Sequence, residues 1–251
     1  MNISPPDRTT TWRRWTGRIA VALALIAAAA LVLGGYAQRD GTRFFAATGP
    51  RRTIGALYLS GDMGLRFDIG RSLTDELAAR GIPTRAIASP VFFKWHRTRA
   101  ELDAVIADQV RAALRQTGSD RIVAIGRSYG ADVLQTGLAD LPQDLRRHVA
   151  GVILIVPGDK VYFRSDPSTL AYDGVPDSIG ARTVNRIDWA PVTCIYGTQE
   201  SDSLCPDVVG PNARIVGLPG GHFLDHDSGA VFAQIFSAID RIAPPTKRRS
   251  L

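Results

Sequence analysis

The chain has 251 residues, of which 45% are hydrophobic, which suits one α/β domain with a well-buried core and is short for two enzymatic domains. Its formal charge is +6, but the excess lies at the two ends, in Arg8, Arg13, Arg14, Arg18, Lys247, Arg248 and Arg249. No basic helix stripe, zinc-finger spacing or RNP-like motif lies between them, so nucleic acid is excluded as a partner and a membrane surface is favoured.

The first 37 residues read as a leader. Residues 19 to 33 are IAVALALIAAAALVL, with arginines before them and GGYAQ after them. This pattern is typical of a signal peptide cleaved after Ala37, or of a retained N-terminal membrane anchor, because the apolar run extended to Ala37 approaches the about 20 residues that cross a bilayer. Both alternatives predict an exported protein, periplasmic or otherwise outside the cytoplasm.

The rest of the chain divides by composition. Residues 38–52 carry Gly, Pro and charge without periodicity and predict a linker. The folded domain is expected over 53–243, followed by a basic tail over 244–251.

Strands and helices alternate through the first half of that domain. We predict strands at 53–61 and 83–89 and helices at 65–80 and 100–116, with Gly81 and Gly118 ending the helices. An aromatic, basic loop, VFFKWHRTR, precedes the second helix.

The second half continues the alternation. We predict an elbow strand and helix over 121–139, strands at 151–157, 191–197 and 212–220, and a closing helix at 230–242. Residues 158–190 are polar and aperiodic and predict an insertion with little regular structure. The sequence therefore predicts an α/β-hydrolase fold, a mostly parallel central sheet with helices on both faces and no large lid domain.

The stretch RIVAIGRSYGADVL, residues 121 to 134, carries the main chemical signal. An apolar strand runs into Gly126-Arg127-Ser128-Tyr129-Gly130 and then into a helix. Small residues two before and two after a serine allow the sharp turn of a nucleophile elbow, so Ser128 is the candidate nucleophile.

A nucleophilic serine needs a histidine base, and in this architecture the base follows the last strand. Of the four histidines, His222 stands directly after that strand in LPGGH, and His226 is the second choice.

The acid that orients the histidine is expected in the loop after the strand PVTCIYG. Both Glu200 and Asp202 lie there, and Asp202 is favoured because a bridge from Cys194 to Cys205 would fix its part of the loop. Asp225 and Asp227 are weaker alternatives on the histidine's own loop.

The two cysteines, 11 positions apart, predict a disulfide in an exported protein, with two free buried thiols as the alternative. Their spacing does not suggest a metal site, and we expect neither a metal nor a cofactor.

An oxyanion formed during ester cleavage needs two backbone N–H donors. The amide of Tyr129 is one candidate, and the amide of Asp62 or Met63, in the loop after the first strand, is the other.

Four segments, LSGDMG, GRSYGADVL, CIYGTQESDSLCP and LPGGHFLD, together resemble the VirJ/AcvB family of bacterial virulence proteins over about residues 54 to 240. The resemblance implies an exported α/β-hydrolase-like protein associated with hydrolysis of aminoacyl-phosphatidylglycerol, chiefly the lysyl form. It gives the triad roles to Ser128, Asp202 and His222. The family's SGDGGW loop has Met63 and Leu65 here, and its YFW stretch appears as FFKW, residues 92 to 95.

The expected substrate is therefore a membrane phospholipid with an aminoacyl ester. Its acyl chains would meet an aromatic lip formed by Phe92, Phe93 and Trp95, and its cationic amino acid would meet carboxylates such as Asp132. The alternatives are a generic carboxylesterase or lipase, and a non-catalytic secretion or virulence partner that keeps the hydrolase scaffold for binding.

Overall fold

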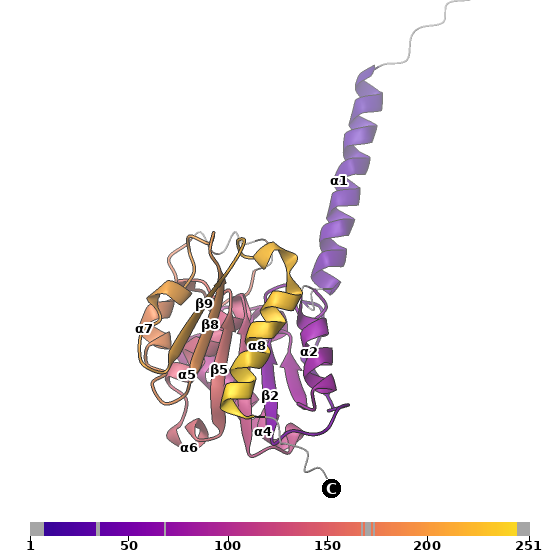
Figure 1. Ribbon diagram of the computed structural model, residues 1–251. Helices are drawn as coiled ribbons and strands as arrows, with labels where there is room; N and C mark the ends of the chain where they lie inside the picture. The colour runs from indigo at the N-terminus through magenta and orange to yellow at the C-terminus, as the bar shows by residue number, and fades with distance from the viewer. Residues whose placement is uncertain are drawn as a thin grey trace, which may run out of the picture.

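A seven-stranded sheet forms the centre of the protein, with its strands in the order β1-β3-β2-β4-β5-β8-β9 (Figure 1). The computed structural model describes residues 8–33, 36–67, 69–166, 168, 172 and 174–244. The strands of this sheet are β1 (Thr42–Phe45), β2 (Ile54–Leu59), β3 (Thr84–Ile87), β4 (Arg121–Arg127), β5 (Val149–Ile155), β8 (Val192–Gly197) and β9 (Ala213–Leu218). All neighbours pair in parallel except β1, which runs antiparallel to β3.

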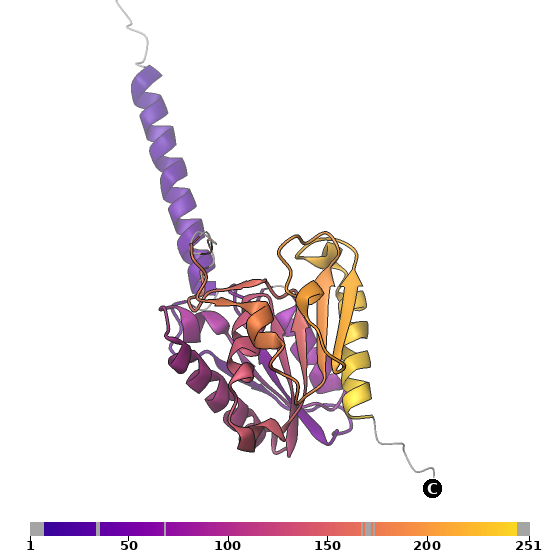
Figure 2. The same ribbon diagram turned by 90° about the vertical axis from the view of Figure 1, so that its left-hand side faces the viewer.

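Helices cover both faces of the sheet, as the alternating pattern predicts (Figure 2). One face packs against α4 (Arg99–Thr117) and α5 (Tyr129–Ala139), and the other against α2 (Gly70–Ala79) and α8 (Ser228–Ile242). The shorter helices are α3 (Ser89–Phe93), α6 (Gln143–Arg146) and α7 (Gly180–Val184).

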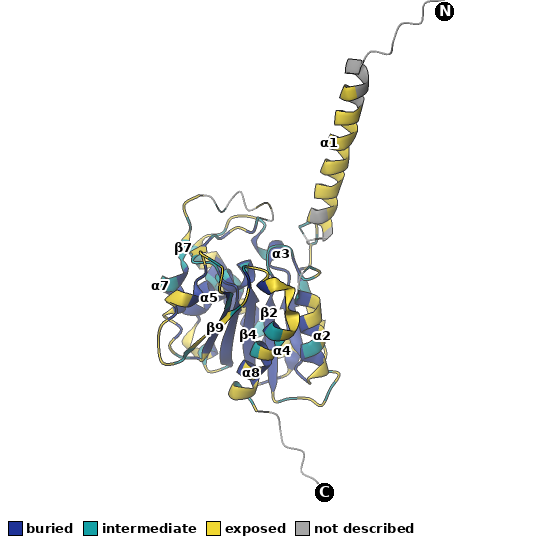
Figure 3. Ribbon diagram, turned by 45° about the horizontal axis from the view of Figure 1, so that its top comes forward, coloured by how far each residue is buried: buried dark blue, intermediate teal, exposed yellow. Residues whose placement is uncertain are grey.

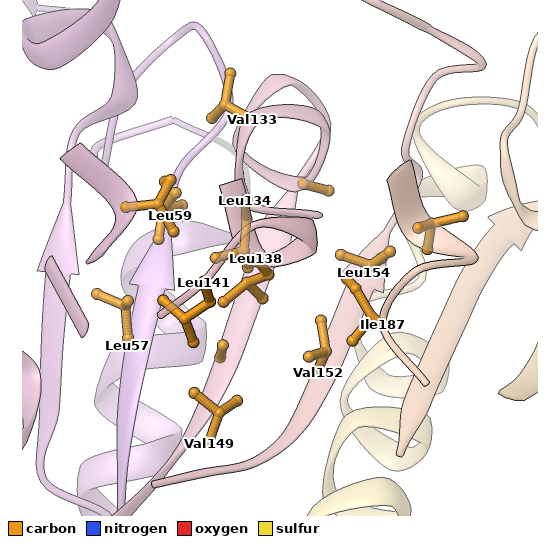
Figure 4. Packing of buried hydrophobic residues seen from close by; sticks show 14 of the residues in the cluster. Leu57, Leu59, Val133, Leu134, Leu138, Leu141, Val149, Val152, Leu154 and Ile187 are labelled. Carbon is orange, nitrogen blue, oxygen red and sulfur yellow. The ribbon is translucent and has the colours of Figure 1, made fainter. Parts of the chain in front are cut away.

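The central strands are buried on both sides, so their sequences are apolar throughout rather than alternating. In β2, Leu57 and Leu59 belong to the core layer shared with α4 and α5, whereas Ala56 and Tyr58 belong to the layer shared with α2 and α8. Figure 4 shows the first layer, in which the leucines of β2 lie beside those of α5. Figure 3 shows how burial concentrates in the sheet.

The predicted helix stops are confirmed. The backbone of Gly118 is left-handed, with φ of 59°, directly after α4, and Gly81 follows α2 with φ of 78°. At its other end, α4 begins with a capping box between Thr98 and Glu101.

Residues 38–52 are not a free linker. Within them, β1 adds an edge strand to the sheet, with Thr42 opposite Ile87 and Phe45 opposite Thr84. The N–H of Arg52 donates to the carbonyl of Gly81, which fixes the end of the segment. The segment lacks periodicity because an edge strand this short is held by backbone pairing and buries none of its side chains fully.

The leader contains helix α1 (Arg8–Leu33), which projects away from the domain and exposes apolar side chains such as Trp12 and Leu25 (Figure 1). No helix in the described part of the chain is long and apolar enough to cross a membrane. Residues 1–7 and the basic tail from 245 onward lie outside the described residues.

The insertion at 158–190 has little regular structure, as predicted. It contains the two-stranded pair β6 (Lys160–Val161) and β7 (Ser178–Ile179) and then α7. Backbone bonds from Ser165 to Phe93 and from Asp159 to Asp202 fasten it across the carboxyl ends of the strands. In the described residues it forms a short cover and not a lid domain.

Candidate active site

Ser128 occupies a sharp turn between β4 and α5. Its backbone has φ of 51° and ψ of −129°, a conformation that residues other than glycine rarely adopt and that is typical of a nucleophile elbow. A side chain at Gly130 would collide with the carbonyls of Leu59 and Ser60, and one at Gly126 would collide with Ala131. Both glycines are therefore required for the strand to meet the helix this closely.

The Ser128 side chain lies at one end of a continuous hydrogen-bonded line. Its Oγ is 2.9 Å from Nε2 of His222, and Nδ1 of His222 is 2.8 Å from Oε1 of Glu200. With Nδ1–H donating to the carboxylate, Nε2 is the unprotonated nitrogen that can accept the serine proton.

Glu200, and not Asp202, contacts the histidine. Glu200 forms a tight turn with Gly197, in which the Gly197 N–H donates to its Oε2 and its own N–H donates to the Gly197 carbonyl. This turn leaves Oε1 facing His222, with only 5% of the side chain exposed. Asp202 lies further along, exposed, with its carbonyl bonded to the N–H of Asp159. The prediction of Asp202 as the orienting acid is wrong, because the turn with Gly197 presents Glu200 to His222 and Asp202 lies past that turn.

The histidine loop lies directly against the end of β8. A Cβ atom added to Gly197 would lie 2.2 Å from the carbonyl oxygen of Gly221, and the N–H of Gln199 donates to the carbonyl of Gly220. These contacts place His222 between the two loops. His226 lies on the same cavity wall, but its ring stacks on Phe223 at 5.6 Å rather than meeting Ser128.

The predicted disulfide is present and closes the loop that carries Glu200. Cys194 in β8 is bonded to Cys205, both fully buried. Neither is a free thiol. The bridge holds the segment after β8 against the sheet.

The loop after β2 lies beside the serine, as the oxyanion prediction requires. An ideal Cβ on Gly61 would be 3.5 Å from the Cβ of Ser128. The N–H of Met63 donates to no acceptor in the described part of the chain. Tyr129 follows Ser128 at the start of α5, so its amide lies at the positive end of that helix.

A cavity of about 1000 Å³ opens beside this line of residues. Its walls combine aromatic rings and carboxylates with two basic residues, Arg127 and Lys160. The aromatic residues are Tyr58, Phe67, Tyr129, Tyr162, Tyr172 and Phe223, and the acidic ones are Asp62, Asp132, Asp159, Glu200 and Asp202.

The predicted aromatic lip is not part of this wall. Phe93 is fully buried in the core, Phe92 packs against that core, and Trp95 is 74% exposed outside the cavity. The stretch begins with the short helix α3, whose Phe93 ring meets Tyr129 of α5 edge-on. Sequence reasoning missed Tyr162 and Tyr172, although their place in an insertion after a central strand was a usable signal.

Asp132, the predicted substrate contact, does line the cavity. Its Oδ1 accepts from the N–H of Gly158 at 2.8 Å. Burial raises the pKa of Asp132 well above its ordinary value, and the nearby carboxylates of Asp62, Asp202 and Asp159 raise it further. Burial also raises the pKa of Asp62, whose Oδ2 accepts from the Tyr172 hydroxyl.

The hydroxyl of Tyr129 lies near Asp132 and Asp62. The side chain is 3% exposed, and its hydroxyl makes no hydrogen bond in the described structure. Its ring stacks on Tyr172, with centroids 6.3 Å apart. Among the described residues, no group of three or more His, Cys, Asp or Glu side chains could hold a metal ion.

The fold is shared with solved hydrolase structures at low sequence identity. Est1E from Butyrivibrio proteoclasticus with bound ferulic acid aligns with a TM-score of 0.59 and 16% identity, covering 80% of this chain and 94% of that chain. The α/β hydrolase GrgF from Penicillium sp. sh18 gives 0.59 and 12%, covering 80% and 93%. An α/β serine hydrolase homologue from Coxiella burnetii gives 0.57 and 12%, covering 79% and 90%. These likenesses establish the α/β-hydrolase fold.

A search of curated proteins gave no match. The family described as bacterial virulence protein (VirJ) matches residues 53–243, which is the whole sheet apart from its edge strand β1. The match includes the elbow, the bridged loop and the histidine loop. The chain therefore belongs to the VirJ family of bacterial virulence proteins.

Proposed function

We propose that this protein is an exported serine hydrolase that cleaves the aminoacyl ester of aminoacyl-phosphatidylglycerol, with the lysyl form favoured. The observation that carries the proposal is the hydrogen-bonded line from Ser128 through His222 to Glu200 at the wall of a large cavity. Its members come from distant parts of the chain, and in a serine hydrolase each has a defined role.

The reaction would pass through an acyl-enzyme. Oγ of Ser128 attacks the ester carbonyl while Nε2 of His222 takes its proton, and Glu200 stabilises the resulting imidazolium. The tetrahedral oxyanion is held by the amide of Tyr129 and an amide of the loop after β2. The intermediate then expels the glycerol hydroxyl of phosphatidylglycerol, which receives the proton from His222. Water activated by the same histidine releases the amino acid and restores the serine.

The cavity supports a cationic acyl group. Its carboxylates at Asp62 and Asp132 are counter-ions for a primary ammonium. The faces of Tyr172 and Tyr162, with ring centroids 5.1 Å apart, offer cation–π contact.

The disulfide and the family indicate an exported protein. Within that, we propose the periplasm and its membrane surface as the place of work. The basic leader and a phospholipid substrate both favour this location.

The direct test incubates the full chain with lysyl-phosphatidylglycerol and measures released lysine. We expect release by the wild type and a loss of at least about 10³-fold in Ser128→Ala, because the nucleophile is gone. Ser119→Ala is the matched control just before β4, at the opposite end of that strand from Ser128, and should keep wild-type activity. Release that persists in Ser128→Ala would remove the mechanism.

A generic carboxylesterase is the second candidate, because the solved neighbours include an esterase from Pyrococcus furiosus. Comparing kcat/KM for lysyl-phosphatidylglycerol with that for its N-acetylated form and for a 4-nitrophenyl acyl ester separates the two. A preference for uncharged acyl groups would favour the esterase. A folded chain that a fluorophosphonate fails to label at Ser128 would instead favour a non-catalytic binding protein.

A further inference from the structure

One residue of the leader reaches the wall of the active site. The Tyr36 hydroxyl donates to the backbone carbonyl of Asp62 at 3.0 Å and lies 2.8 Å from Oγ of Ser165. Tyr36 follows α1 and stands before the expected cleavage point after Ala37. The leader therefore touches both the loop after β2 and the insertion at 158–190.

The contact is partly enclosed by the protein. Ser165 is 2% exposed, and its N–H donates to the carbonyl of Phe93, so the partner of Tyr36 is itself fixed. Burial raises the pKa of the Tyr36 hydroxyl, and the carboxylates of Asp62 and Asp166 raise it further. The hydroxyl therefore keeps its proton and remains a donor at neutral pH.

The bond to Asp62 sets the direction of a peptide group in the loop that lies beside Ser128. The Asp62–Met63 peptide is trans, so the N–H of Met63 points opposite to the Asp62 carbonyl to which Tyr36 donates. That N–H has no acceptor in the described residues, and Met63 lines the cavity next to Gly61. Gly61 in turn lies against Ser128.

We propose that Tyr36 is a positioning residue whose hydroxyl fixes the Asp62–Met63 peptide, so that the Met63 N–H serves as the second oxyanion donor. The leader up to Tyr36 then remains part of the working protein, and removal of residues 1–37 would lower its activity. This inference rests on the proposed hydrolase function, because only a developing oxyanion uses the donor.

The test compares Tyr36→Phe with the wild type in the full chain, because this substitution removes the hydroxyl and keeps the ring. Orientation of an oxyanion donor acts on the transition state, so kcat should fall about 10-fold while KM changes less than about twofold. Affinity for a trifluoromethyl ketone, which forms a tetrahedral oxyanion adduct on serine, should fall by a similar factor. A 4-nitrophenyl ester serves as substrate beside lysyl-phosphatidylglycerol, so the Ser128 machinery is measured independently of the lipid.

Two further variants guard against a general loss of structure. Tyr196→Phe removes a hydroxyl from β8 outside the cavity and should leave both constants unchanged. Ser165→Ala removes the second partner of Tyr36, and its effect should not add to that of Tyr36→Phe, since both act through one contact. An unchanged kcat in Tyr36→Phe, or an equal loss in Tyr196→Phe, would overturn the positioning role.

The state of the leader is read from the natural protein. Intact mass and N-terminal sequencing of the protein from its host envelope should find a chain that still contains Tyr36. A chain beginning at Gln38 would overturn the inference and leave the proposed function standing. Absence of hydrolysis of either ester by the wild type would instead refute the proposed function, and with it the oxyanion role.

Discussion

His222 is held by a carboxylate that is almost completely enclosed. The Glu200 side chain is 5% exposed, takes a backbone N–H on one oxygen and the imidazole on the other, and lies within the field of the buried Arg127 guanidinium. A carboxylate with both oxygens engaged has one orientation, and it gives the histidine one tautomer.

We therefore expect Glu200→Gln to lower kcat for ester cleavage by about 10²- to 10⁴-fold, because the amide cannot stabilise the imidazolium. Asp202→Asn, the matched variant two residues further on, should stay within about twofold of the wild type. Steady-state kinetics on lysyl-phosphatidylglycerol measure both. A larger loss in Asp202→Asn than in Glu200→Gln would show that the acid has been misassigned.

The charge on Asp132 has opposite effects on stability and on binding. It lowers the stability of the fold because the side chain is buried, and it is the charge proposed to bind the substrate ammonium. Its folded-state pKa is raised by burial and by neighbouring carboxylates, so folding favours the protonated form. The stabilising effect of that protonated form is fully present below the unfolded-state pKa of about 3.9 and is lost as the pH rises through the folded-state pKa.

Asp132→Asn should therefore raise the free energy of unfolding relative to the wild type by about 1 kcal/mol at pH 7.5, because asparagine keeps the Gly158 bond without the charge. The difference should disappear near pH 4. Urea unfolding at the two pH values measures it, with Asp144→Asn, an exposed acid on α6, as control. A variant less stable than the wild type at pH 7.5 would contradict this account of the buried charge.

At the scale of elements, the strand β8 and its following loop form one unit. The Cys194–Cys205 bridge closes a short loop that contains the Gly197–Glu200 turn. The orienting acid therefore depends on a covalent link as well as on hydrogen bonds.

Replacing both cysteines by alanine should lower the free energy of unfolding by about 3 kcal/mol on the chain-entropy account. Activity should also fall, because the segment that presents Glu200 to His222 gains freedom. Denaturant unfolding of the wild type with and without reductant measures the first effect, and the double variant should show no response to reductant. Equal stability of the two proteins would mean that hydrogen bonds alone fix the loop.

Sequence patterns predicted the elements whose signals are local. The elbow at Ser128 needs only a strand, two glycines and a helix, all adjacent in the chain. The choice between Glu200 and Asp202 depends instead on a turn whose hydrogen bonds the sequence does not display. Phe93 was misplaced because α3 turns its ring toward Tyr129 of α5, a contact between segments far apart in the chain.

At the scale of the whole molecule, the alternation of strands and helices predicted the mostly parallel sheet and its two covered faces. It did not predict β1, since an edge strand held by backbone pairing leaves little side-chain pattern. It also treated the leader and the domain as separate, whereas Tyr36 makes tertiary contacts that no periodicity encodes.

The Tyr36 contact reverses the usual logic of precursor maturation. In a zymogen, proteolysis removes an inhibitory segment and activity appears. Here, proteolysis after Ala37 would remove the hydrogen bond from Tyr36 to the loop after β2 and leave a folded enzyme with a lower kcat. Envelope proteolysis would then act as an off-switch, and recombinant chains begun at the domain boundary would understate the protein's catalytic power.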